Sequence, residues 1–419
     1  MSSVLPFDII DQIIDIVGEN KDTDLLKELA LVSHSFLQIC SKHLFATVEL
    51  HDAISRRHVI SLKKGFVKLL QSRPDIVKYI RKLTYKVEDH SRLVPLPACT
   101  SFECDDHLLS PTLPNFLRTI PRLNRLTIIG SKLDWNTLDS SLTSAFLHLM
   151  HLPTVNHINL SRIRNFPFSS LTPSVNLHRL DLSYMDIRGP DNSSPEIVQL
   201  EMVPKIREFH TSYSSRLTTK LLYAKRQDGR PAFNFIHLRR LSMSFFTHKD
   251  ELNIRYLLQN AKLLEKLHLS VGHGRSLVQL HDILSLSARS LKVLGLTVPL
   301  YDYATDLLLA GLCEELEAMA GRNMLEALFF EFQVDDEEDE EFTGLIIQKV
   351  ERVLVEPGWS ALRQVSFKVS ITYCPVSGAD PTELFESLQF LPDRYLSYLP
   401  ELESVAFSYS VYARQFECD

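Results

Sequence analysis

The chain has 419 residues, of which 45% are hydrophobic and 23% are charged, as in an ordinary globular protein long enough for two or three domains. Its net charge of -7 argues against nucleic-acid binding as the main role, because counterion release requires a strongly basic face. Six cysteines at irregular spacings do not form a disulfide framework, so we expect a reducing compartment, cytoplasmic or nuclear.

The N-terminal residues do not resemble a signal peptide, because Asp8, Asp11 and Asp15 interrupt their apolar run. No stretch reaches the ~18 uncharged apolar residues that a membrane-spanning helix needs, and neither end carries a lipidation signal. We therefore expect neither a membrane nor a nucleic acid among the partners.

The first fifty residues predict a small helical module. From Asp8 onward the apolar residues follow helical spacing in a wide stripe, and Pro6 stands just ahead of it. A polar break ends at Asp24, and a second apolar helix that continues to Ile39 is expected to be capped by Thr23 or Asp24. A module of ~50 residues hides only about 60% of its surface, so its surplus apolar face should meet a partner.

The opening Leu5-Pro6, the aliphatic helix, the polar gap and the closing segment from Leu29 to Phe36 together resemble the F-box. Residues 39–50 are similar to the tail of fungal F-box proteins, although Phe36 stands where that family commonly has Trp and the polar gap is longer than usual. The resemblance implies docking on a Skp-type adaptor and, through it, on cullin. The residues expected to face the adaptor are Leu5, Pro6, Ile9, Ile10, Ile13, Ile14, Leu25, Leu29 and Val32. The alternative is an ordinary helical cap on the domain that follows.

An apolar pattern of the form LxxLxL recurs eleven times in the rest of the chain. The copies are Ile80-Leu83-Tyr85, Leu123-Leu126-Ile128, Val155-Ile158-Leu160, Leu177-Leu180-Leu182, Ile206-Phe209-Thr211, Leu238-Leu241-Met243, Leu264-Leu267-Leu269, Leu291-Leu294-Leu296, Leu325-Leu328-Phe330, Leu362-Val365-Phe367 and Leu402-Val405-Phe407. The fifth copy is the weakest, with Thr211 where an aliphatic residue belongs. Leu180 follows Ile158 by 22 residues and Leu126 follows Leu83 by 43, so the repeat is irregular.

This pattern resembles irregular leucine-rich repeats, in which each unit supplies one short parallel strand and a convex-side segment of variable length. Helices are expected over 136–151, 251–262, 276–288, 303–320, 342–355 and 382–398. The predicted fold class is α/β: an all-α F-box over 1–50, a linking helix over 51–75, and a leucine-rich-repeat-like solenoid over 76–419 with a parallel sheet and convex-side helices. The asparagine that the family places after the last leucine is missing from every copy, and a generic α/β fold is the alternative.

The residue before the middle leucine should point to the concave face of such a sheet. In six of the first seven copies this residue is basic, and Glu208 is the exception. The basic column consists of Lys82, Arg125, His157, Arg179, Arg240 and Lys266. Arginine pairs bidentately with carboxylate and phosphate, so the column is a candidate site for an acidic or phosphorylated target. Alternatively, exposed strand positions simply favour basic residues for solubility.

No catalytic or cofactor motif is visible. The chain has 13 glycines and neither GxGxxG nor GxxxxGK[ST], and it lacks GxSxG and HExxH. Cys99, Cys104 and His107 have no fourth ligand at zinc-site spacing. We therefore expect no enzyme activity, no metal and no cofactor. The sequence predicts a substrate-recognition subunit of an SCF-type E3 ubiquitin ligase, or else a leucine-rich-repeat scaffold with a vestigial F-box and no ligase role.

Overall fold

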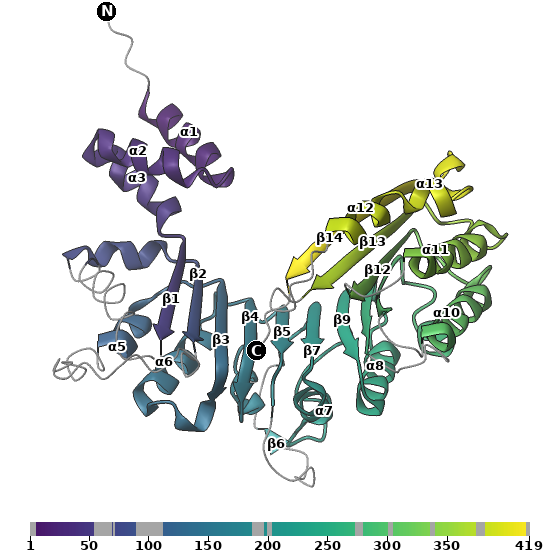
Figure 1. The fold of residues 1–419 in the computed structure, drawn as a ribbon. Helices are drawn as coiled ribbons and strands as arrows, with labels where there is room; N and C mark the ends of the chain where they lie inside the picture. The colour runs from purple at the N-terminus through teal and green to yellow at the C-terminus, as the bar shows by residue number, and fades with distance from the viewer. Residues whose placement is uncertain are drawn as a thin grey trace, which may run out of the picture. The chain divides into compact units, whose positions relative to one another are not determined.

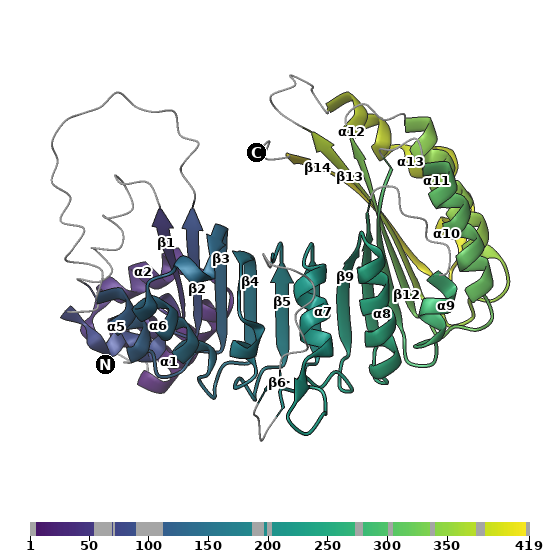
Figure 2. The same ribbon diagram turned by 90° about the horizontal axis from the view of Figure 1, so that it is seen from below.

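The protein is α/β, and in each of its two units helices pack against a sheet of parallel strands (Figures 1 and 2). The computed structural model describes residues 6–53, 69, 72–88, 112–186, 197–198, 203–272, 280–300, 305–335, 340–373 and 382–415. The chain divides into two compact units: Met1–Pro204 with Tyr223–Phe233, and Lys205–Leu222 with Asn234–Asp419. The candidate zinc ligands Cys99, Cys104 and His107 lie outside the described residues.

The N-terminal module has three helices, α1 (Phe7–Glu19), α2 (Thr23–Val32) and α3 (His34–Leu44). The expected caps were wrong: Asp22 caps α2, and its carboxylate accepts a hydrogen bond from the backbone N–H of Leu25 at 3.1 Å. The expected single second helix also divides in two. Ser33 is extended, with φ of -162°, and its hydroxyl accepts from the N–H of Phe36 to begin α3.

The strands of the first unit are β1 (Thr47–Ala53), β2 (Lys82–Glu88), β3 (Arg125–Asp134), β4 (His157–Arg164) and β5 (Arg179–Ser183). Each pairs in parallel with the next. The sequence pattern did not predict β1. This strand begins shortly after the end of α3, with no separate linker, and pairs with β2. Around the strands lie η1 (Pro74–Tyr79), α5 (Thr112–Thr119), η3 (Trp135–Thr137), α6 (Ser140–Met150) and η4 (Phe168–Leu171), and a small separate pair, β6 (Ile197–Val198) with β8 (Lys225–Arg226). The linking helix expected over 51–75 is wrong at its start, because residues 51–53 belong to β1, and most of the remaining range lies outside the described residues.

The strands of the second unit are β7 (Glu208–Ser212), β9 (Arg240–Phe245), β10 (Lys266–Val271), β11 (Val293–Pro299), β12 (Ala327–Asp335), β13 (Gln364–Tyr373) and β14 (Ala406–Gln415), again parallel in this order. Its helices are α7 (Ser215–Tyr223), α8 (His248–Asn260), α9 (Leu280–Ser285), α10 (Thr305–Met319), α11 (Glu340–Val355), α12 (Thr382–Gln389) and α13 (Leu391–Tyr395), followed by η6 (Leu399–Glu401). Helices α8, α10 and α11 stand on one face of the strands (Figure 2). The single helix expected over 382–398 is thus two.

All eleven predicted segments contribute a strand. In the first ten copies the paired residues are buried, whereas Val405 and Phe407 of the last copy are only partly buried. Leu126, Leu180 and Leu294, for example, are completely buried. Thr211, in the weak fifth copy, is also buried, and its hydroxyl lies 2.9 Å from that of Thr218 on α7. This hydrogen bond explains how a polar residue occupies an aliphatic position.

One backbone contact recurs from strand to strand. The carbonyl oxygen of Arg81 accepts from the N–H groups of both Asn124 and Arg125, at 2.8 and 3.1 Å. The carbonyls that make the equivalent pair of contacts belong to Ala46, Asn124, Asn156, Arg207, Arg239, Glu265, Lys292 and Glu326. Successive strands are therefore joined by backbone hydrogen bonds at the positions where they begin.

Candidate functional site

The three-helix module presents much of the apolar surface that the sequence analysis assigned to it. Ile9, Ile13, Leu25 and Val32 are 41%, 47%, 38% and 65% exposed, and Pro6 is also exposed. On α1 the exposed residues Ile9, Ile13 and Ile16 follow one another at i, i+4 and i+7, so they form a single stripe on one side of the helix.

The structure corrects part of the adaptor-facing set. Ile14 is only 1% exposed and forms the core of the module with Leu26, Ile39 and Cys40, so it does not lie on the outward face. Ile10 and Leu29 are partly buried against this core, and Leu5 lies outside the described residues. The exposed apolar residues that the sequence analysis did not select are Phe7, Ile16 and Leu31.

Polar contacts join α1 to α3 on the side of α1 opposite the stripe of Ile9, Ile13 and Ile16. Lys42 lies 2.8 Å from a carboxylate oxygen of Asp11 and 2.7 Å from one of Asp15, and His43 Nε2 lies 2.7 Å from the same Asp15 oxygen. The hydrogen bond from Lys42 holds the pKa of Asp15 below its ordinary value, against the opposing effect of burial and with help from His43. Glycine at position 18 leaves room for the His43 ring, since a Cβ there would overlap that ring.

In the first unit, the predicted basic column is a real row of neighbours. Lys82 pairs in register with Arg125, Arg125 with His157, and His157 with Arg179. Neighbouring parallel strands lie about 4.8 Å apart, so these side chains start from adjacent positions on one face of the sheet.

An acidic residue between two of these basic residues changes what the row can bind. Asp181 is 6% exposed, and its carboxylate lies 2.8 Å from His157 Nε2 and 3.1 Å from Arg179 Nε. Burial alone would raise the pKa of Asp181, but the hydrogen bonds from His157 and Arg179 outweigh burial and hold that pKa below its ordinary value. His157 and Arg179 therefore already have an anionic partner.

The second unit continues the pattern with Glu208, Arg240 and Lys266 in register on β7, β9 and β10. Arg240 Nη1 lies 3.1 Å from Glu208 Oε1, so the exception in the predicted column neutralises its neighbour. Among the described residues, Lys82, Arg125 and Lys266 form no ion pair. These three, of the six predicted, are the cations best placed to meet a ligand.

The same face of the second unit carries a polar group that the sequence analysis did not single out. His268 Nε2 lies 3.1 Å from Thr297 Oγ1, and the His268 ring occupies the space that a side chain at Gly295 would take. Burial lowers the pKa of His268.

A second polar group lies on the last strands of this unit. Lys368 Nζ lies 3.9 Å from the centre of the Tyr412 ring, and the Tyr412 hydroxyl donates to Glu331. The contact between Lys368 and Tyr412 was hard to predict, because Tyr412 lies on β14 and the register of this strand differs from the expected one. Val365 pairs with Phe407, two residues beyond the expected Val405.

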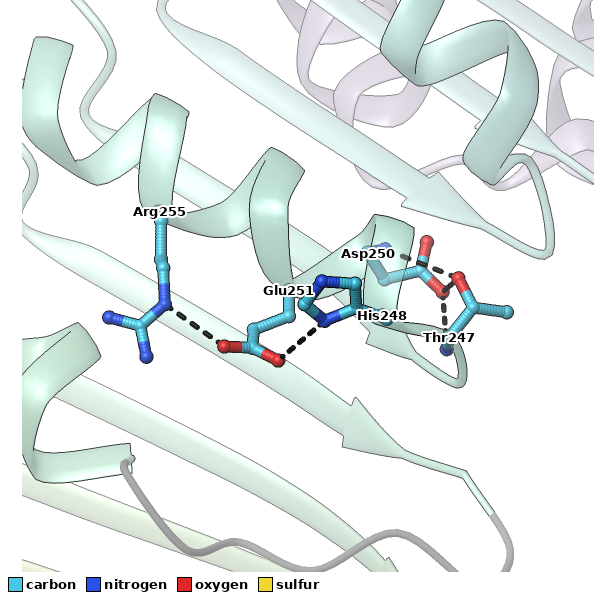
Figure 3. A network of polar contacts seen from close by, with 5 residues as sticks. All are labelled: Thr247, His248, Asp250, Glu251 and Arg255. Carbon is cyan, nitrogen blue, oxygen red and sulfur yellow. Dashed lines mark hydrogen bonds and ion pairs between the residues drawn. The ribbon is translucent and has the colours of Figure 1, made fainter. Parts of the chain in front are cut away.

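Polar contacts at the start of α8 serve the fold (Figure 3). Asp250 is 4% exposed and accepts from the Phe246 and Thr247 N–H groups, the Thr247 hydroxyl and, at 2.5 Å, the Ser215 hydroxyl. Glu251, one residue on, forms ion pairs with Arg255 at 3.0 Å and His248 at 3.2 Å. Each polar group here has a structural partner, which favours a structural role over a binding one.

No group of three or more His, Cys, Asp or Glu residues within the described ranges could hold a metal ion. Within the same described ranges, no helix is long and apolar enough to cross a membrane. Compared with models of known protein families and with curated protein sequences, the chain matches none.

Proposed function

We propose that the chain is a substrate-recognition subunit of an SCF-type E3 ubiquitin ligase, in which the helical module is an F-box that docks on a Skp-type adaptor and the leucine-rich repeats bind the target protein. The observation that carries this proposal is the stripe of Ile9, Ile13 and Ile16 on α1. These side chains are 41–58% exposed on a module whose small core is already filled by other residues. Such a face is stabilised when a partner covers it.

The arrangement of the chain supports a two-ended adaptor. The module passes through Phe45 and Ala46 directly into β1, whose partner β2 begins the row of repeats. A partner on the helices and a target on the strands would thus be carried by one continuous chain. In this arrangement the chain would act by bringing the target close to the enzyme: tethering raises the effective concentration of target lysines near a charged conjugating enzyme. Catalysis would belong to other subunits, so we propose no enzyme activity for this chain.

Co-purification of the full chain with a recombinant Skp-type adaptor tests the proposal. We expect Ile13→Asp to reduce adaptor binding at least tenfold, because it places a charge in the apolar stripe. The matched control is Ile236→Asp in the second unit, since Ile236 is 50% exposed and Ile13 47%.

Wild-type protein that binds no adaptor would contradict the F-box assignment and favour a leucine-rich-repeat scaffold with a vestigial F-box. Adaptor binding that is unaffected by Ile13→Asp would contradict only the surface assignment. Recovery of cullin together with the adaptor distinguishes a ligase subunit from a scaffold.

A further inference from the structure

A cavity of about 170 Å³ lies in the helical layer of the second unit, between α9 and the end of α10. Its apolar lining consists of Leu284, Ala288, Leu291, Met319 and Leu325. The cavity is partly open to solvent beside the exposed lining residues Ser285 and Arg322, and the rest of its lining is mostly apolar.

The cavity has a local structural cause. Helix α9 ends at Ser285, and residues 286–290 form turns in place of a further helical turn. Ala288, in these turns, contributes only a methyl group to the lining. On the other side, α10 ends at Met319, and the chain returns through Asn323 to β12. The space between the two segments is bounded by the small side chain of Ala288 on one side and by Met319 on the other.

The neutral polar residues of the lining already use their hydrogen-bonding groups within the protein. Asn323 Nδ2 donates to the Met319 carbonyl at 2.9 Å, and Asn323 Oδ1 accepts from the Leu325 N–H at 3.1 Å. Ser285 Oγ donates to the Asp282 carbonyl at 2.7 Å. A polar ligand group placed beside Asn323 or Ser285 would lose its water without gaining a partner, which is unfavourable.

We propose that this cavity binds a compact, uncharged, apolar molecule of roughly the size of benzene or toluene. An engineered cavity of about 150 Å³ lined by Leu, Ile and Phe stays dry and binds benzene. The remaining lining residues, His281 and Arg322, belong to the rim: Arg322 is exposed, and His281 Nδ1 lies 3.6 Å from Asp282 Oδ1. The ligand would therefore be recognised by the apolar walls of the cavity. This proposal is independent of the adaptor and of ubiquitin transfer.

The test uses the full chain labelled with ¹³C at the methionine methyl groups, titrated with toluene and followed by NMR. We expect a saturable shift of the Met319 methyl signal, assigned with Met319→Leu, because an aromatic ring in the cavity lies against that side chain. Benzoate, which has the same ring and a charge, should bind at least tenfold more weakly. No saturable shift with toluene, or equal binding of benzoate, would overturn the proposal.

A pair of matched variants locates the site. Ala288→Leu fills the cavity and should lower toluene affinity at least tenfold. Ala318→Leu adds the same apolar bulk at an exposed position of α10 that does not line the cavity, and it should leave the affinity unchanged. Equal affinity in both variants would overturn the assignment to this cavity. If Ala288→Leu fails to fold, the wild-type Met319 shift and the benzoate comparison still decide the outcome.

Discussion

His157 Nε2 on β4 lies 2.8 Å from Asp181 Oδ2 on β5, so a residue of the predicted basic column is held by a buried acid of the next strand. Arg179 Nε contacts the other oxygen of the same carboxylate at 3.1 Å. Asp181 is 6% exposed, and these contacts replace the water that it has lost. The three residues are therefore a structural unit as well as part of the candidate target surface.

The first prediction concerns Asp181→Asn. The folded-state pKa of Asp181 lies below its ordinary value, so the stabilisation is fully present above the unfolded-state pKa near 4 and is lost as the pH falls through the folded-state value. We expect the variant to lose about 1–3 kcal/mol of unfolding free energy at pH 7. Its stability should also fall less than that of the wild type between pH 5 and pH 3. Urea unfolding in a Trp359→Phe background measures both effects, because the tryptophan fluorescence then comes from Trp135, which is buried in the same unit. Parallel pH profiles would contradict this account.

The sequence could predict the row of basic residues but not which of them are already paired. The column was defined by the residue before the middle leucine of each copy, whereas Asp181 stands between Leu180 and Leu182. A carboxylate at that position looks like one more exposed strand residue until the neighbouring strand is in place. Reading the central residue of each copy beside its flanking residues would have found the acid.

The second prediction compares two adjacent carboxylates of α8 (Figure 3). Asp250 is 4% exposed and accepts four hydrogen bonds, so Asp250→Asn should cost roughly 2–3 kcal/mol of unfolding free energy. The matched control is Glu251→Gln, which breaks only ion pairs near the surface and should cost less than about 1 kcal/mol. Urea unfolding followed by circular dichroism measures the difference. Equal losses would contradict the structural role assigned to the hydrogen bonds of the buried Asp250.

The third prediction is a double-mutant cycle between Gly295 and His268. A Cβ at residue 295 would overlap the imidazole of His268, so Gly295→Ala alone should cost at least about 1 kcal/mol through overpacking. Gly295 has no positive φ, so backbone strain does not contribute. In the His268→Ala background the same change should be nearly neutral, which gives a coupling energy of about 1 kcal/mol in thermal or urea unfolding. Additive losses would place the obstruction elsewhere.

The strands were predictable because ten of the eleven copies of the LxxLxL pattern bury their paired residues, as Leu294 and Leu296 do completely. Details set by single polar residues were less visible. The extended backbone of Ser33 divides one apolar helical stretch into α2 and α3, and the periodicity continues across that break. On β14 the alternation of side chains remains the same after a shift of two residues, so the pattern alone could not distinguish Val405 from Phe407 as the partner of Val365.

The last prediction separates the two kinds of residue in the basic column. Lys82 and Arg125 are neighbours in register without an ion pair to a described residue, whereas Arg179 and Arg240 contact Asp181 and Glu208. We expect Lys82→Gln with Arg125→Gln to weaken binding of a fluorescent hexaglutamate peptide on the order of tenfold, because arginine and lysine form the charge-assisted hydrogen bonds that hold a carboxylate. The control, Arg179→Gln with Arg240→Gln, removes the same number of positive charges and should have a smaller effect. Fluorescence anisotropy at low and at physiological salt measures both. Equal losses in the two double variants would mean that the peptide responds to overall charge rather than to a site at Lys82 and Arg125.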